Sequence, residues 1–169
     1  MKMKKFPLLC AAATVLLGGC STFGFGGSNN DDDNVPTVVK KKADYGQAYK
    51  DYVELGAQYL QMGRYDLAEP KLQRAIEIDS HPPEAWNILA VLYEEKRDIA
   101  SGNQVYQKLI HSHPEYLLGY TNYATFLCKF DRDSEMQTLL GQMRGRNAEF
   151  KAAAGIAEGN CMQRRGQRG

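Results

Sequence analysis

The residues that most often bind metals or transfer protons are few in this 169-residue sequence, and their spacing suits neither task. His111 and His113 are two positions apart, which on a helix would point their side chains about 200° from each other. No cysteine or carboxylate stands at a metal-ligand spacing beside them. The acidic groups at positions 94–95 and 131–133 are interpreted as solvated helix ends. No nucleophile elbow, phosphate-binding loop or HExxH motif occurs, so we expect no catalytic residue, no metal site and no enzyme activity.

Composition and charge exclude two further classes of protein. Apolar residues make up 43% of the chain and charged residues 24%, which is typical of a folded domain and argues against wholesale disorder. Without Lys2, Lys4 and Lys5, which lie in a segment expected to be cleaved, 18 basic and 20 acidic residues remain. A chain this close to neutral lacks the long positive face that phosphate backbones require, so we do not expect nucleic acid as a partner.

The N-terminus resembles a bacterial lipoprotein signal peptide over residues 1–19. The apolar stretch at residues 8–17 would be about 15 Å long as a helix, half of the bilayer core, and is too short to span it. Leu17-Gly18-Gly19-Cys20 then resembles a lipobox, in which two small residues precede a cysteine that becomes lipidated. We expect a covalent lipid on Cys20 and no other cofactor, and several acyl chains anchor a protein stably. An ordinary secretory signal with a chance cysteine is the alternative.

The residues after Cys20 predict the location and a tether. Ser21 stands where lipoproteins retained in the inner membrane usually carry aspartate, so we expect lipid anchoring at the outer membrane, on its periplasmic face. Residues 20–43 form a linker rich in Gly, Ser, Asn and Asp, with an r.m.s. reach on the order of 25 Å. The folded domain is expected at residues 44–169.

Small and apolar residues recur every 34 positions in this domain. Within each period the apolar positions are three or four apart, so each unit is predicted to be a pair of amphipathic helices. The pattern resembles the tetratricopeptide repeat, which implies an all-α helical solenoid with units at residues 49–82, 83–116 and 117–150 and a partial unit at 152–169. The series are Tyr52, Trp86 and Tyr120; Gly56, Ala90 and Ala124; and Leu72, Tyr106 and Leu140.

The last two units depart from the pattern. Unit three carries Met136 and Met143 where small residues are usual, so its second helix is expected to pack less regularly. The fourth unit fits with a one-residue shift that places Gly159, Met162 and Gly166 at the small, apolar and turn positions. A capped array of about three and a half repeats and a longer solenoid cut short are both open, and truncation is slightly favoured.

Two cysteines remain in the repeat domain. In an oxidising periplasm two thiols usually pair, and Cys128 and Cys161 lie near the ends of first helices in adjacent units. We predict a disulfide between them, which would close a loop of about 34 residues and contribute roughly 3 to 4 kcal/mol. Two unpaired buried thiols are the alternative.

The resemblance to tetratricopeptide repeats implies a concave groove lined by the first helices. It is apolar in unit one and acidic in unit two, which suits a peptide with an apolar anchor and a basic flank. Asn87 could clamp a peptide carboxylate, but Glu94 and Glu95 would repel one, and Val53, Val91 and Leu118 could equally be ordinary packing residues. The expected groove residues are Lys50, Val53, Ala57, Leu60 and Gln61; Glu84, Asn87, Val91, Glu94 and Glu95; and Leu118, Thr121, Thr125 and Lys129.

Two stretches, residues 52–63 and 121–128, look like the type IV pilus biogenesis and stability lipoprotein family, PilF/PilW. In some members a cysteine ends the second stretch and pairs with one in the next repeat, which matches Cys128 and Cys161. The resemblance implies a pilotin-like or stabilising factor that promotes secretin assembly or localisation, or supports the pilus, and whose partners are pilus proteins. The alternative is an envelope adaptor that recruits peptidoglycan-remodelling enzymes through the same anchor and groove.

Overall fold

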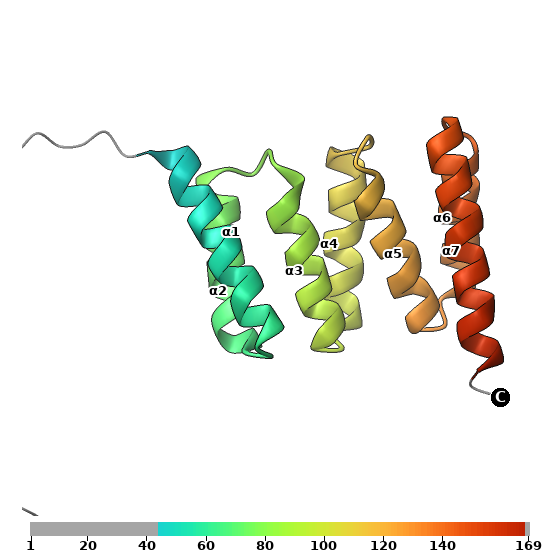
Figure 1. Cartoon of the computed structure of the whole chain (residues 1–169), viewed down its shortest axis with the longest axis horizontal. Helices are drawn as coiled ribbons and strands as arrows, with labels where there is room; N and C mark the ends of the chain where they lie inside the picture. Colours follow the sequence, from blue (N-terminus) through green and yellow to red (C-terminus); the bar gives the residue numbers. More distant parts are fainter. Residues whose placement is uncertain (1–43, 168–169) are drawn as a thin grey trace, which may run out of the picture. The chain divides into compact units, whose positions relative to one another are not determined.

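The computed structural model describes residues 44–167, which contain helices and no strand (Figure 1). The signal peptide, Cys20 and the tether predicted above lie outside the described residues. Within them, no helix is both long enough and apolar enough to cross a bilayer. The helices are α1 Tyr45–Gln61, α2 Tyr65–Ile78, α3 Pro83–Glu95, α4 Ile99–Ser112, α5 Leu117–Lys129, α6 Asp133–Arg144 and α7 Ala148–Gly166.

The helices pack as the predicted solenoid of tetratricopeptide repeats. α1 packs on α2, α3 on α4 and α5 on α6, and each following first helix also contacts the second helix before it. Neighbouring first helices touch as well, so α1, α3, α5 and α7 follow one another along the array (Figure 1). The predicted fold class is therefore confirmed.

The first helices of the three pairs end at equivalent turns. Gly63, Arg97 and Asp131, which are 34 positions apart, have positive φ angles of 70°, 58° and 54°. A left-handed residue at this point breaks the hydrogen-bond ladder and reverses the chain into the second helix. Gly63 adopts it without strain because glycine has no β-carbon, and aspartate adopts it more readily than most other residues. Arg97 and Asp131 adopt it because the surrounding helix pair fixes the turn.

The boundary between units three and four differs from the prediction. α7 begins at Ala148, four residues before the predicted start of the partial unit, because the Asn147 side chain accepts a hydrogen bond of 3.0 Å from Phe150 N and caps the helix. Phe150 is buried, and its ring meets that of Tyr120 edge-on at 5.2 Å. The Phe150 contact therefore adds a turn at the start of this helix.

Two further expectations concern packing in units three and four. Met136 and Met143 are 3% and 0% exposed, so their flexible side chains fill the space between α6 and its neighbours. The backbones of α5 and α6 nevertheless approach each other over a shorter stretch than those of the first two pairs, in line with the less regular packing expected for α6. In α7, Ala154 and Cys161 are buried 34 positions after the buried residues Tyr120 and Leu127, so this helix keeps the unshifted period. Gly159 and Met162, which the one-residue shift placed at the small and apolar positions, are exposed, so the predicted shift is wrong. Met162 is 64% exposed, since no described helix covers that face of α7.

The candidate peptide-binding groove

The residues expected to line the groove lie on the first helices, but they differ in exposure. Lys50, Glu84, Leu118 and Thr125 are exposed, whereas Asn87 and Glu94 are only 8% and 9% exposed. Gln61 and Glu95 are also exposed. The other expected groove residues are partly buried, and they are Val53, Ala57, Leu60, Val91, Thr121 and Lys129. The face is therefore a shallow mixed surface, and part of it takes part in contacts between repeats.

Lys50, Val53 and Glu84 come together at a pocket between α1 and the start of α3. The pocket has a volume of about 480 Å³ and is mainly apolar. Its other walls come from Gly46, Tyr49, Glu54, Asp79 and Pro82. Three carboxylates and one ammonium group therefore surround an apolar hollow. Sequence reasoning missed the contribution of Tyr49 and of residues 79–82 to this pocket.

Tyr49 is fixed by the start of α3. Ala85 N donates a hydrogen bond of 3.3 Å to Tyr49 Oη, and the hydroxyl in turn lies 3.4 Å from Glu84 Oε2. The pKa of Tyr49 is raised to about 12, mainly by burial and also by the Glu84 carboxylate, which together outweigh the lowering effect of the hydrogen bond from Ala85 N. The phenol is therefore neutral and acts as a rigid wall of the pocket.

Asn87 is bound within the array. Asn122 Nδ2 of α5 donates a hydrogen bond of 2.9 Å to Asn87 Oδ1 of α3, so one end of the Asn87 amide is already engaged. The bond uses the acceptor of the Asn87 amide and does not involve its Nδ2 donors, which a clamp for a peptide carboxylate would use. The bond between Asn87 and Asn122 ties repeat two to repeat three.

Glu94 is also paired across repeats. Lys129 Nζ of α5 lies 3.0 Å from Glu94 Oε1 and 3.1 Å from Glu95 Oε1, and Tyr106 Oη lies 3.4 Å from Glu94 Oε2. Burial lowers the pKa of Lys129, but its bonds to the two carboxylates outweigh that effect and raise it. Lys129 therefore offsets the negative charge expected for this part of the groove, and the acidic character lies at the α1–α3 pocket.

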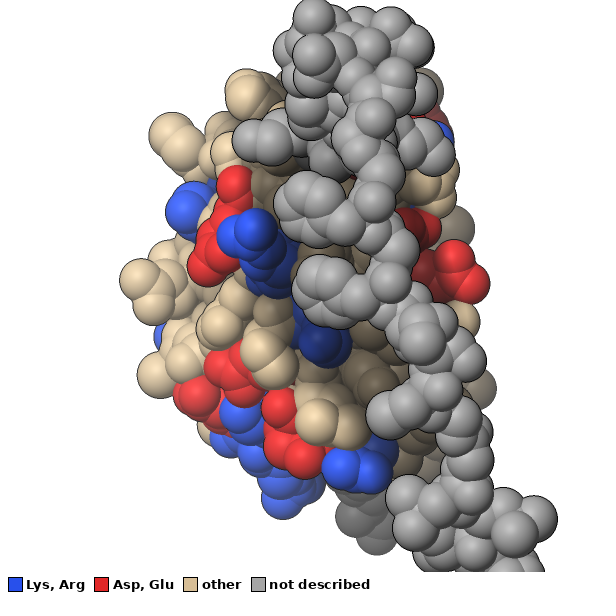
Figure 2. Space-filling model, turned by 90° about the vertical axis from the view of Figure 1, so that its left-hand side faces the viewer, with Lys and Arg blue, Asp and Glu red and all other residues tan. Residues whose placement is uncertain are grey.

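The charges at the α1 end are mixed. Figure 2 views the array from this end, and on its visible part acidic and basic side chains lie next to one another. On this visible part the charged side chains form no basic stripe. In the described residues, no group of three or more His, Cys, Asp or Glu side chains is placed to hold a metal ion.

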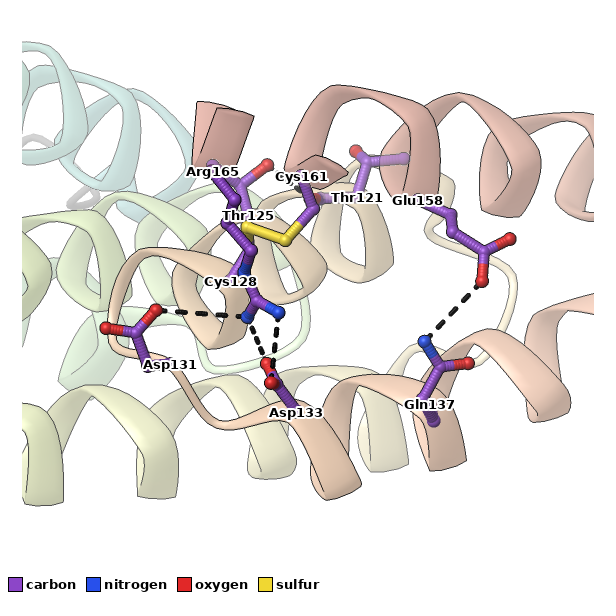
Figure 3. Close-up of a disulfide and its surroundings, with 9 residues drawn as sticks. All are labelled: Thr121, Thr125, Cys128, Asp131, Asp133, Gln137, Glu158, Cys161 and Arg165. Atoms are coloured by element: carbon purple, nitrogen blue, oxygen red, sulfur yellow. Dashed lines mark hydrogen bonds and ion pairs between the residues drawn. A yellow bond between two sulfur atoms is a disulfide. The ribbon is translucent and has the colours of Figure 1, made fainter. Parts of the chain in front are cut away.

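Cys128 and Cys161 form a disulfide in the structure, with 5.8 Å between their Cα atoms. The bond joins α5 to α7 at the end of the groove that Thr121 and Thr125 line (Figure 3). Beside it, the Arg165 guanidinium forms an ion pair with Asp133 and lies 3.8 Å from Asp131. The last described first helix is thus attached covalently and electrostatically to unit three.

No protein-family model matches the chain. Over 96 residues the chain is 31% identical to the Type IV pilus assembly protein PilF of Pseudomonas aeruginosa. The chain is a distant homologue of that protein. The match spans 56% of this chain and 38% of PilF, so the chain corresponds to less than half of its relative.

A solved structure of PilF also resembles this chain. The structure comes from a functional characterization of Pseudomonas aeruginosa PilF and matches with a TM-score of 0.53 and 28% sequence identity. The match covers 58% of this chain and 44% of that chain. Both matches are therefore to PilF, which is described as a type IV pilus assembly protein.

Proposed function

We propose that this protein is an outer-membrane lipoprotein scaffold for type IV pilus biogenesis, which promotes assembly or localisation of the secretin or stabilises the pilus through its groove. The observation that carries the proposal is the 31% identity to the pilus assembly protein PilF. That relative is described as an assembly protein, and a solenoid of helix pairs with an open concave face is suited to binding another protein.

The α1–α3 pocket gives the groove a place for an anchor. Its apolar walls, Tyr49, Val53 and Pro82, would take one aliphatic or aromatic side chain of a bound segment. The carboxylates of Glu54 and Glu84 would favour a lysine or arginine beside that anchor. Because Tyr49 is already held in place by α3, little ordering is required when the segment binds.

The lipid on Cys20 supplies the location in this proposal. A scaffold on a tether on the order of 25 Å long would be held close to the outer membrane, which raises the effective concentration of the groove near a pore assembling there. Binding and placement are then the whole mechanism, and no chemical step is required of the protein.

The first experiment compares heat-resistant secretin multimers in outer-membrane fractions, and the number of surface pili, with and without the gene. Loss of multimers supports a pilotin that acts on the pore, and Cys20→Ala should then fail to restore them. Intact multimers with lost pili support a role in fibre stability. No change in either contradicts the pilus proposal and favours an adaptor for peptidoglycan-remodelling enzymes.

A groove variant tests the pocket separately from the anchor. Val53→Glu places a charge in the apolar hollow and should abolish complementation at normal protein level. Gln104→Glu adds the same charge on an exposed position of α4 outside the groove and should complement fully. Equal complementation by both variants would exclude the pocket as the binding site.

A further inference from the structure

Arg146, in the turn between α6 and α7, is held in place by four contacts. Its Nη1 donates to Pro114 O at 2.5 Å and its Nη2 to Tyr120 Oη at 2.7 Å. The guanidinium carbon lies 4.9 Å from the centroid of the Tyr120 ring and 5.0 Å from that of the Phe150 ring. An arginine held against two rings is fixed in orientation and weakly hydrated, which favours binding of a planar anion.

The charge of this arginine is not compensated nearby. Among the residues that the structure describes, Arg146 takes part in no recorded ion pair. A guanidinium has five N–H donors, and its two recorded hydrogen bonds leave three for another ligand. Arg144, two residues earlier, is paired with Glu158 and is not available in the same way.

Arg146 lines a pocket of about 360 Å³ that lies mainly between the second helices α4 and α6, with Tyr120 of α5 in its wall. No carboxylate contributes to its walls. The amides of Gln107 and Gln142 and the ring of His111 add further hydrogen-bonding groups, and Ile110 adds an apolar side. A smaller hollow of about 190 Å³ shares Gln107, Ile110 and Gln142 and extends the furrow along α4 and α6. Its wall includes the Glu135 carboxylate, whose charge is paired with Arg132, so the unpaired positive charge lies at the Arg146 end of the furrow.

We propose that this furrow is a second protein-binding surface, which takes an extended acidic segment of a partner with one carboxylate bound to Arg146. The carboxylate matches the fork of the guanidinium, and charge complementarity selects it because the pocket has a cation and no acidic side chain. The glutamine amides can bond the peptide groups of an extended chain on either side. This surface would let the protein hold one partner in its groove and another on the second helices.

Nuclear magnetic resonance on the full chain in detergent tests the proposal. The probe is the peptide acetyl-Ala-Glu-Ala-amide, and acetyl-Ala-Gln-Ala-amide is its uncharged match. The glutamate peptide should shift the side-chain N–H signals of Arg146 and Gln142 saturably, whereas the glutamine peptide should bind at least tenfold more weakly. Shifts of equal size with both peptides, or the same shifts with sodium chloride at equal ionic strength, would overturn the proposal.

Variants separate binding from folding. Arg146→Gln should abolish the response, but it also removes contacts to Pro114 and Tyr120. Gln142→Ala leaves those contacts intact and should weaken the glutamate peptide about fivefold, as expected for one lost hydrogen bond. Arg164→Gln, on the exposed side of α7, is the charge-matched control and should change nothing.

Two outcomes of the variant series would contradict the proposal. Unchanged affinity in Gln142→Ala would show that the peptide does not lie in the furrow. Saturable shifts with inorganic phosphate and none with the glutamate peptide would identify a phosphate site and exclude an acidic protein segment.

Discussion

Gly56 of α1 lies so close to Leu72 of α2 that a β-carbon built at Gly56 would come within 2.7 Å of Leu72 Cγ and Cδ2. Leu72 is fully buried in the core between α2 and α3 and has no free space to move into. This contact sets the spacing of the first helix pair. Ala90 and Ala124 hold the same position in the next two pairs, where each carries a methyl group.

We expect Gly56→Ala to destabilise the protein by about 1–3 kcal/mol, because overpacking of the α1–α2 contact outweighs the gain in helix propensity. The free energy of unfolding, measured by urea titration with circular dichroism, gives the effect. Gly159→Ala in α7 is the matched control: nothing lies within 4 Å of a β-carbon there, and it should stabilise the helix by about 0.5–1 kcal/mol. If Gly56→Ala also stabilises the protein, the close approach does not limit the packing of the pair.

The helix pairs could be predicted because their signal is local and repeated. The 34-residue period and the three- or four-residue spacing of apolar positions determine which faces meet, and this holds for any side chains of suitable size. The turn at Arg97 gave no such signal, since arginine does not favour positive φ by itself, whereas the aspartate at position 131 belongs to a type that is enriched in this conformation. The start of α7 was missed because the cap at Asn147 lies outside the period.

The groove was predicted less well than the fold. Comparing positions that are 34 residues apart does not show which polar side chains of neighbouring repeats bond to each other. Asn87 with Asn122, and Glu94 with Lys129, are each separated by 35 positions. Tyr49 with Glu84 shows the same separation. A search for polar pairs at one residue more than the period would have found all three, and would have assigned Asn87 and Glu94 to contacts between repeats.

Glu69 joins α2 to α3 and should make stability depend on pH. Its carboxylate accepts from Tyr93 Oη at 2.9 Å and from Lys96 Nζ at 2.6 Å. Burial raises the pKa of Glu69, but these two hydrogen bonds and the positive charge of Lys96 lower it by a larger amount, so the net shift is downward. A carboxyl with a lowered pKa stabilises the fold above its ordinary pKa, and this contribution is lost as pH falls through the lowered value.

We therefore expect the protein to lose part of its stability between about pH 5 and pH 3. In Glu69→Gln the free energy of unfolding should depend less on pH over this range. At pH 7 the variant should be about 1 kcal/mol less stable, a modest value because the pair is partly exposed. Urea titrations at several pH values measure both effects. Glu77→Gln, which alters an exposed pair within α2, should retain the wild-type pH profile. A profile unchanged by Glu69→Gln would assign the acid sensitivity to other carboxylates.

The attachment of α7 is predicted to depend on the disulfide. This helix buries only Phe150, Ala154 and Cys161, and glycines at 155 and 159 weaken it further. Its ion pairs from Arg165 to Asp133 and from Arg144 to Glu158 are partly exposed and contribute little. Most of what holds the C-terminal half of α7 against α5 is therefore the bond between Cys128 and Cys161.

Replacement of both cysteines by alanine should lower the stability of unit three and α7 by roughly 3 to 4 kcal/mol, the value expected for a separation of 33 residues. Hydrogen exchange followed by mass spectrometry should show faster exchange in α7 and at the end of α5, with α1–α3 unchanged, because contacts in a solenoid reach only neighbouring repeats. Arg165→Gln removes the ion pair alone and should have an effect below about 1 kcal/mol. Faster exchange over all helices would mean that the array unfolds as one unit, and unchanged exchange in α7 would mean that Phe150 and Ala154 suffice to hold it.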